Sequence, residues 1–170
     1  NKPGMLSEAE MNEIKKHPRY GMDLVRARDI ASQAVLSVIY KHHERIDGSG
    51  YPQGLRGDEL EIFPRICAVA DVYDALVSDR PYRAGYLPHR AMDIMECECA
   101  GYDLKILQTF FHHIAAYPVG TIVGLNNGLI GVVVQNAYGH PRRPRVRIFC
   151  SRDNFAPLDA HEIDLVETLN

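Results

Sequence analysis

The stretch AVLSVIYKHHERIDGSGYP, residues 34–52, joins a predicted helix to a long loop and decides how the rest of the chain is interpreted. Apolar residues recur at helical spacing through Val35 and Val38, and His42 extends the same face. From Arg45 to Glu61 the chain contains four glycines, which is typical of a structured loop and not of a helix or strand. Loops of this length in compact domains are usually functional. The sequence therefore predicts functional side chains where this helix ends.

Helical patterns flank this loop on both sides. Ser7 and Glu10 have the spacing of a capping box, and His17-Pro18 is predicted to end the helix that the box begins. After the loop, Pro64 begins a helix that is apolar nearly all round, and we expect it to be buried. Asp103 is a predicted helix cap. Helices are expected over residues 8–16, about 20–27, about 31–40, 64–77, about 89–99 and about 103–113.

The character of the sequence changes at Tyr117-Pro118. Residues 121–125 and 129–134 are apolar and flank Asn126-Asn127-Gly128, which is a strong signal for a β hairpin. Residues 144–149 alternate arginine with apolar residues, as a half-buried strand does. We therefore predict a mainly α-helical domain over residues 1–117, followed by a small β appendage, hairpin-like or barrel-like, over residues 118–170.

Composition excludes several classes of protein. The chain has 19 Lys and Arg against 22 Asp and Glu, a net charge of −3, so it lacks the basic footprint of a protein that binds polymeric nucleic acid. No apolar run reaches the roughly 18 to 20 residues of a membrane span, and no basic-then-apolar leader opens the chain. The four cysteines lack CxxC spacing, which favours reduced thiols. These features predict a cytoplasmic protein.

His42 and His43 are candidate metal ligands, because neutral imidazole binds first-row metal ions. Adjacent side chains point about 100° apart on a helix, so both reach one site only if that site lies at the helix end. Asp71 and Asp74 stand at positions i and i+3 in the apolar helix, and buried carboxylates require a partner or a metal ion. The alternative interpretation is that this acidic stripe is the solvent face of the helix.

Other basic residues fit the same chemistry less specifically. Alone, His17 before Pro18 is better explained as a helix-end residue, and His112-His113 lack a patterned carboxylate. Arg80-Pro81-Tyr82-Arg83 is suited to bind a phosphodiester and stack on a base, or it is an exposed turn. The arginines of residues 142–147 offer phosphate contacts, although strand arginines are more often solvated. Since no Walker-type loop or GxSxG elbow occurs, phosphate-ester hydrolysis by a metal-activated water is the predicted reaction class.

Several ordered motifs resemble the HD-GYP family of bacterial cyclic di-GMP phosphodiesterases. They are HHERIDGSGYP at residues 42–52, AVADVYDAL at 68–76 and DRPYR at 79–83, and the segments NKPG at 1–4 and KHP at 16–18 also fit. The resemblance covers about residues 1–115, and the segment after Tyr117 looks like an extension that some members carry. It implies a partial HD-type helical bundle with two or three divalent metal ions, often iron or manganese. Such a domain hydrolyses cyclic di-GMP to pGpG or GMP in second-messenger signalling.

The resemblance also implies roles for individual residues. It matches family metal ligands to His17, His42, His43 and Asp71, and assigns the metal-centre chemistry to the last three of these. It matches the signature loop beside the substrate, and residues that contact the substrate or shape its pocket, to Gly50, Tyr51, Pro52, Asp74, Arg80 and Arg83.

The start of the chain bears on activity. In the family, a His-Asp pair lies just upstream of the segment that matches residues 1–4, so we expect this chain to be an incomplete part of the phosphodiesterase, barely active alone. The alternative is a catalytically inactive HD-GYP-type module that binds either cyclic di-GMP or a GGDEF-type cyclase partner. The partner would dock through the loop from Gly48 to Gly57.

Overall fold

The computed structural model describes residues 4, 6–28, 32–80 and 83–168, and divides into two compact units. The first unit comprises residues 1–87 and 93–110, and the second comprises residues 88–92 and 111–170. Three expectations fall outside the described residues: the family match at residues 1–3, the helix start near residue 31, and the roles of Pro81 and Tyr82 after the long helix.

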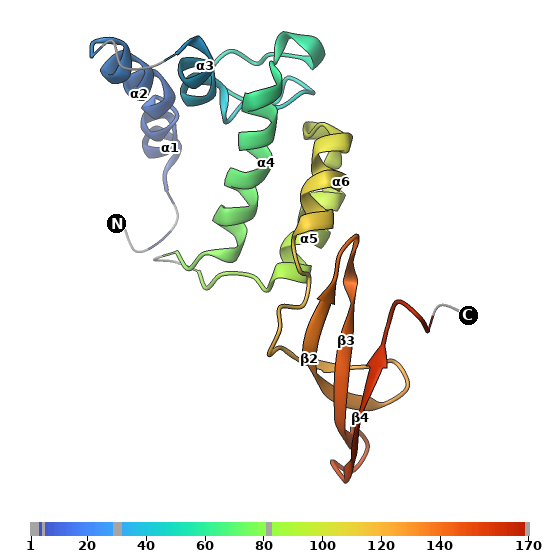
Figure 1. Cartoon of the computed structure of the whole chain (residues 1–170). Coiled ribbons are helices and arrows are strands. Elements are labelled where there is room, and N and C mark those ends of the chain that lie inside the picture. The colour runs from blue at the N-terminus through green and yellow to red at the C-terminus, as the bar shows by residue number, and fades with distance from the viewer. Residues whose placement is uncertain (1–3, 5, 29–31, 81–82, 169–170) are drawn as a thin grey trace. The chain divides into compact units, whose positions relative to one another are not determined.

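The first unit is helical. Helix α2 packs against α3, and α3 packs against α4 (Figure 1). Buried side chains of this unit include Leu36 from α3, Leu60 from the loop and Val69 from α4. The α-helices of the described residues are α1 (Glu8–Ile14), α2 (His17–Arg26), α3 (Gln33–Lys41), α4 (Ile62–Val77), α5 (Pro88–Cys97) and α6 (Leu104–His113), with 3₁₀ turns at Gly57–Glu59 and Cys99–Gly101.

Two helix starts follow the local signals in the sequence. The Glu10 amide donates to the Ser7 hydroxyl, and the Ser7 amide donates to the Glu10 carboxylate at 2.7 Å, so the predicted capping box is confirmed. The Asp103 carboxylate accepts hydrogen bonds from the amides of Lys105 and Ile106 at the start of α6. These caps satisfy amide groups that have no partner within the helix.

The prediction that His17-Pro18 ends a helix was wrong. Helix α1 ends at Ile14, and His17 is the first residue of α2, with Pro18 in its first turn. Proline is favoured there because the first-turn amides have no intrahelical acceptor and the ring presets the helical φ angle. His17 therefore lies at the start of a helix and not at the end of one.

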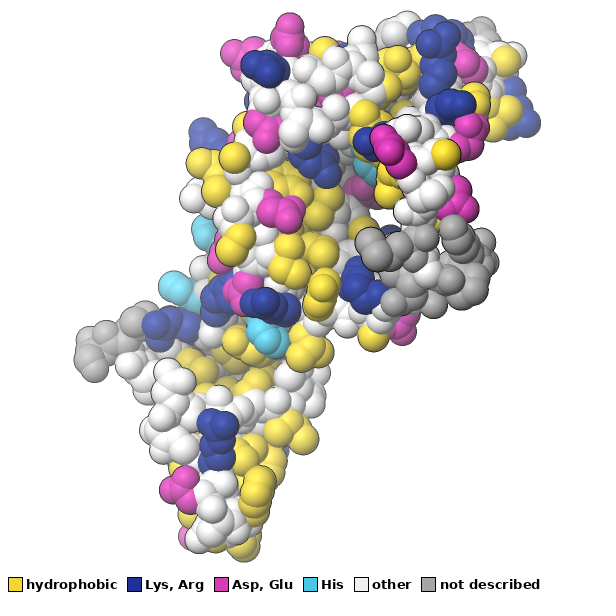
Figure 2. Space-filling view, turned by 180° about the vertical axis from the view of Figure 1, so that it is seen from behind, with side chains coloured by type: hydrophobic (Ala, Val, Ile, Leu, Met, Phe, Trp, Pro, Cys, Tyr) yellow, Lys and Arg dark blue, Asp and Glu magenta, His cyan; other side chains and the backbone are white. Residues whose placement is uncertain are grey.

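Helix α4 is less buried than its apolar composition predicts. Its fully buried residues are Pro64, Ala68 and Val69, whereas Ile62 and Phe63 each expose more than half of their surface, 51% and 57%. Figure 2 shows hydrophobic side chains open to solvent among charged ones on the face in view. The helix therefore buries one stripe and leaves another exposed. No helix in the described part of the chain is long and apolar enough to cross a membrane.

The second unit contains an antiparallel sheet of β1 (Ile122–Gly124), β2 (Leu129–Ala137), β3 (His140–Ser151) and β4 (Pro157–Asp164), in that order. The predicted hairpin across residues 126–128 is confirmed, because β1 pairs with β2. Val133, Val146 and Ile148 form its buried core. Strand β4 was not predicted from the sequence.

The arginines of β3 pair with the sheet itself. Arg145 forms an ion pair with Asp164 at 3.0 Å, and Arg147 forms one with Glu162 at 2.7 Å, both across the β3–β4 ladder. Arg143 donates to the carbonyl oxygen of Leu165. These contacts favour a structural role for the strand arginines over phosphate binding.

Candidate metal centre

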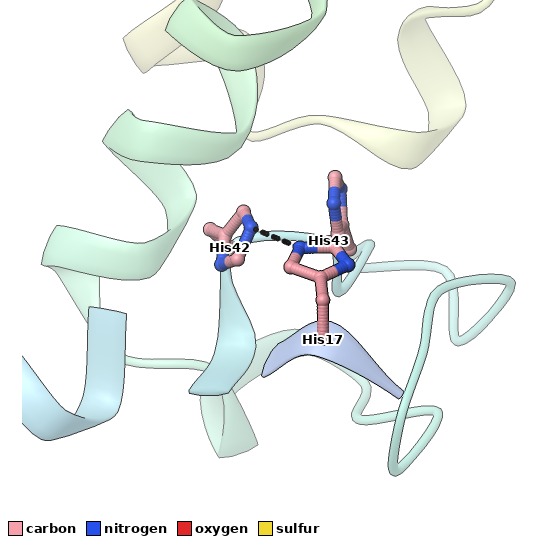
Figure 3. Close-up of side chains that lie close together, drawn as sticks. All are labelled: His17, His42 and His43. Carbon is pink, nitrogen blue, oxygen red and sulfur yellow. Dashed lines mark hydrogen bonds between the residues drawn. The ribbon is translucent and has the colours of Figure 1, made fainter. Parts of the chain in front are cut away.

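Three histidines from two separate parts of the chain converge in the first unit (Figure 3). His17 begins α2, while His42 and His43 directly follow α3. Each offers one ring nitrogen such that the three nitrogens lie within 4.8 Å of one another. The Nε2 atoms of His17 and His42 are 3.2 Å apart. The end of α3 therefore brings both adjacent imidazoles to one place, as the geometry of adjacent helix residues requires.

The other ring nitrogens of this pair contact backbone oxygens. Nδ1 of His17 lies 2.8 Å from the Ile14 carbonyl oxygen, and Nδ1 of His42 lies 2.9 Å from that of Ile39. A carbonyl oxygen only accepts, so both Nδ1 atoms carry a hydrogen and donate it. In the neutral rings, the two Nε2 lone pairs then face each other with no proton between them.

This arrangement fits a cation. Two nitrogen ligands bound at about 2.1 Å to one metal ion lie about 3.0 to 3.4 Å apart, depending on the coordination angle. The observed Nε2 separation of 3.2 Å falls within that interval. Metal-binding histidines commonly donate the other ring hydrogen to a carbonyl or carboxylate, as both rings do here. The chemistry of the donor set therefore suits a divalent metal ion.

His43 is held neutral. Burial lowers the pKa of His43 to about 4, with a smaller contribution in the same direction from His42, while Asp71 opposes the shift. At pH 7 the ring therefore has a free lone pair to offer a metal ion. Oδ2 of Asp71 lies 3.4 Å from Nδ1 of His43, which places a carboxylate beside the histidines.

The charge of Asp71 reaches several groups at this site. Burial raises the pKa of the Tyr51 phenol, and the Asp71 carboxylate raises it further. The pKa of the Cys67 thiol is raised by the same two causes in the same order. Asp71 itself is partly exposed, so it faces an open site and not the helix core. A cation at this position would compensate the carboxylate charge.

The glycine-rich loop folds back over the histidines. The Tyr51 ring stacks on His43 with 4.8 Å between ring centroids, and its amide donates to the His43 carbonyl oxygen at 3.2 Å. The Lys15 ammonium lies 5.5 Å from the Tyr51 ring centroid. Pro52 follows through a cis peptide bond and is exposed. The predicted loop thus covers one side of the cluster.

Replacing Gly50 with alanine is expected to displace this loop. A Cβ atom at Gly50 would lie 2.4 Å from the Arg45 nitrogen and 2.5 Å from the Glu44 Cα, and neither backbone atom can move freely. We expect the free energy of unfolding to fall by about 1–3 kcal/mol, measured by urea denaturation. Gly124→Ala is the control, because a Cβ there meets nothing within 4 Å. Equal stability of the two variants would contradict the packing.

The remaining predicted substrate residues lie toward the end of α4. Asp74 is exposed and accepts a hydrogen bond from the Ser78 hydroxyl at 3.3 Å. The Arg83 guanidinium donates to the carbonyl oxygens of residues 75 and 76, which completes the helix end, and it stacks on Tyr86. Arg80 is exposed and is joined to Arg83 by two backbone hydrogen bonds. None of these three residues is among the converging histidine ligands of the described chain.

Two residues beside the cluster, Lys15 and Glu44, were not predicted from the sequence to belong to the site. Lys15 contacts the Tyr51 ring, and no sequence pattern indicates this contact because it forms only in the folded chain. Glu44 is fully buried, although it sits beside a polar loop. Its position immediately after two candidate ligands was the available signal, because an acidic residue there needs a partner.

The helical fold and the histidine cluster together define a metal-binding α-helical domain with a small β-sheet unit. The chain belongs to the HD domain family, because the model of that family matches residues 1–118. Residues 122–170 match a family described as a KOW domain associated with HD domain. Membership of the HD domain family implies binding of divalent metal ions.

Similar proteins have related descriptions. A cyclic di-GMP phosphodiesterase of Pseudomonas aeruginosa is 36% identical over 165 residues, covering 97% of this chain and 40% of the relative. A cyclic di-GMP phosphodiesterase response regulator of Xanthomonas campestris is 47% identical over 92 residues, covering 54% of this chain and 24% of the relative. A solved structure of an HDG"Y"P protein from Bdellovibrio bacteriovorus has a TM-score of 0.50 at 25% identity, covering 61% of this chain and 32% of that chain. The chain thus spans less than half the length of these relatives.

Proposed function

We propose that the protein is a metal-dependent phosphodiesterase that hydrolyses cyclic di-GMP to pGpG, or further to GMP, in bacterial signalling. The observation that carries this proposal is the pair of Nε2 atoms 3.2 Å apart, each with its Nδ1 hydrogen donated to a backbone carbonyl. In that geometry both Nε2 lone pairs are available to one bound cation, which supports a metal ion between the rings. The substrate class rests on the family and on the descriptions of the two curated relatives.

The metal would be held by His17, His42 and His43, with Asp71 beside His43 as the carboxylate ligand. When bound, divalent ions supply Lewis acidity toward a phosphate oxygen and lower the pKa of a nearby water. We propose iron or manganese, because mixed imidazole and carboxylate donors suit these ions. The backbone carbonyls of Ile14 and Ile39 keep the rings of His17 and His42 in the tautomer that leaves Nε2 free.

The loop would form the wall against the substrate. Tyr51 presents a neutral aromatic ring fixed on His43, which is suited to contact a guanine base or to exclude water from the reacting phosphate. Gly50 allows the loop backbone to lie against residues 44 and 45. Pro52 is exposed next to the ring and continues the same surface.

Asp74 and Arg80 would contact the substrate farther along α4, since both side chains are exposed. Arg83 is committed to the carbonyls at the end of α4, so its proposed contribution is to shape the pocket. Its backbone pair with Arg80, at 2.7 and 3.1 Å, would set where the Arg80 guanidinium lies. The Arg80 guanidinium would neutralise negative charge that develops on the phosphate during hydrolysis.

Removal of metal is expected to abolish hydrolysis. The full-length protein is treated with a chelator, dialysed and reconstituted with Mn²⁺ or Fe²⁺, and nucleotides are separated by chromatography. We expect pGpG or GMP with either ion and a loss of at least about a hundredfold in rate without metal. Binding of cyclic di-GMP without any hydrolysis by the metal-loaded protein would contradict the proposal and favour a binding module.

We further propose that the exposed part of the loop from Gly48 to Gly57, which includes Ser49, Gln53 and Arg56, docks a GGDEF-type cyclase domain. The protein would then act in the cytoplasm, where its substrate is made. For the docking proposal, we expect co-elution with a purified GGDEF domain and loss of co-elution in Gln53→Arg.

We also propose that the helical domain ends at residue 117 and that a β-rich extension covers residues 118–170.

A further inference from the structure

Glu44 is the one charged side chain that is fully buried in the described part of the chain, and it directly follows the two adjacent histidines. Its Oε1 accepts the Gln53 amide hydrogen at 2.6 Å, and its Oε2 accepts that of Leu55 at 3.0 Å. A buried carboxylate is stable only if its oxygens are hydrogen-bonded, and here each oxygen has a backbone partner.

These two bonds fix the chain just after Tyr51, because Glu44 holds the backbone of residues 53 and 55. The backbone of Tyr51 itself is held by the bond from its amide to the His43 carbonyl oxygen, at 3.2 Å. The segment that carries Tyr51 is therefore fixed at both ends to residues 43 and 44, at the end of the helix that delivers His42 and His43. The close packing of Gly50 on the Glu44 backbone reinforces this attachment.

We propose that Glu44 is a positioning residue, whose buried carboxylate fixes the loop backbone so that the Tyr51 ring stays stacked on His43 at the metal centre. Both carboxylate oxygens accept a backbone amide hydrogen, and Glu44 is not among the described side chains whose ligand atoms converge at the cluster, so we assign it to the loop and not to the metal ion. This inference rests on the proposed function, because Tyr51 is assigned to the substrate wall there.

Glu44→Gln tests the proposal. Glutamine has the same length, but its NH₂ group would face one of the two backbone amides, so one hydrogen bond is replaced by a repulsive contact. We expect the KM for cyclic di-GMP to rise at least about tenfold, with the affinity for Mn²⁺ changed less than about threefold. Glu162→Gln, an exposed glutamate of β4, is the matched control.

A second readout follows the loop without any assay of activity. The chain contains no tryptophan, so Tyr51→Trp introduces a single indole at the loop. In this background, Glu44→Gln is expected to raise the acrylamide quenching constant of the indole about twofold or more, because the ring leaves His43. If the metal-loaded protein fails to hydrolyse cyclic di-GMP, the proposed function fails, while the quenching result still tests the positioning role.

Two results would overturn the inference. In one, Glu44→Gln lowers only the unfolding temperature, and its KM and quenching constant match those of Glu162→Gln. In the other, Mn²⁺ affinity falls more than about tenfold, which would make Glu44 a ligand. If Glu44→Gln does not fold, hydrogen exchange in the unsubstituted protein decides. Hydrogen exchange slowed at least about a hundredfold at the Gln53 and Leu55 amides supports the positioning role of Glu44, and unprotected exchange at both amides overturns it.

Discussion

His42→Ala is expected to abolish metal binding at the histidine cluster and to lower hydrolysis of cyclic di-GMP by roughly a thousandfold or more. The variant removes one of the two facing Nε2 atoms, and with it a ligand pair spaced 3.2 Å apart. Titration calorimetry with Mn²⁺ measures the first effect, and steady-state kinetics measures the second. The fold is expected to persist, because His42 lies at the end of α3 and not in its buried face.

The matched control is His112→Ala. His112 is exposed on α6 and belongs to the other adjacent histidine pair in the chain, which no patterned carboxylate accompanies in the sequence. We expect metal affinity and turnover to be unchanged in this variant. Metal retention by His42→Ala, or an equal loss in His112→Ala, would show that the cluster is not the metal centre.

Asp71→Ala is expected to have the second largest effect, with metal retention weakened and turnover lowered by roughly a hundredfold to a thousandfold. The variant removes the carboxylate that lies 3.4 Å from His43 and whose charge acts on Tyr51 and Cys67. Metal content after dialysis and steady-state turnover in the full-length protein are the measurements.

Asp74→Ala distinguishes the role of Asp74 from that of Asp71, the other carboxylate of α4. Asp74 lies one turn farther along the helix and contacts Ser78, so its variant is expected to retain the metal ion. Asp153→Ala, in an exposed turn of the second unit, is the control for activity and is expected to behave like the unsubstituted protein. Full activity of Asp71→Ala, or loss of metal from Asp74→Ala alone, would contradict the assignment of Asp71.

Local signals predicted much of the fold. The capping box of Ser7 and Glu10, the cap at Asp103 and the turn at residues 126–128 each act within a few residues, and each appears in the structure. Strand β4 was missed because it is exposed along most of its length and because its alternation of polar and apolar residues breaks at His161-Glu162. The burial of α4 was overestimated because composition does not show which apolar faces find a neighbour.

The candidate site was only partly readable from residue patterns. Adjacent His42 and His43 with an acidic apolar helix pointed to a metal site, but His17 lies 25 residues earlier and meets His42 only because α2 packs on α3. Pattern alone assigned His17 to a helix end, and the family resemblance supplied its role as a ligand. The buried carboxylate of Glu44 and the use of Arg83 at the helix end depend on tertiary hydrogen bonds that no spacing rule reveals.

The most direct test of the metal centre is an anomalous diffraction measurement on crystals of the manganese-loaded protein. The structure predicts an anomalous peak about 2.1 Å from Nε2 of both His17 and His42, with His43 and Asp71 completing the ligands. The two Nδ1 atoms would keep their bonds to the carbonyls of Ile14 and Ile39. Absence of a peak between these rings, with manganese bound elsewhere in the protein, would contradict a phosphodiesterase built on this cluster.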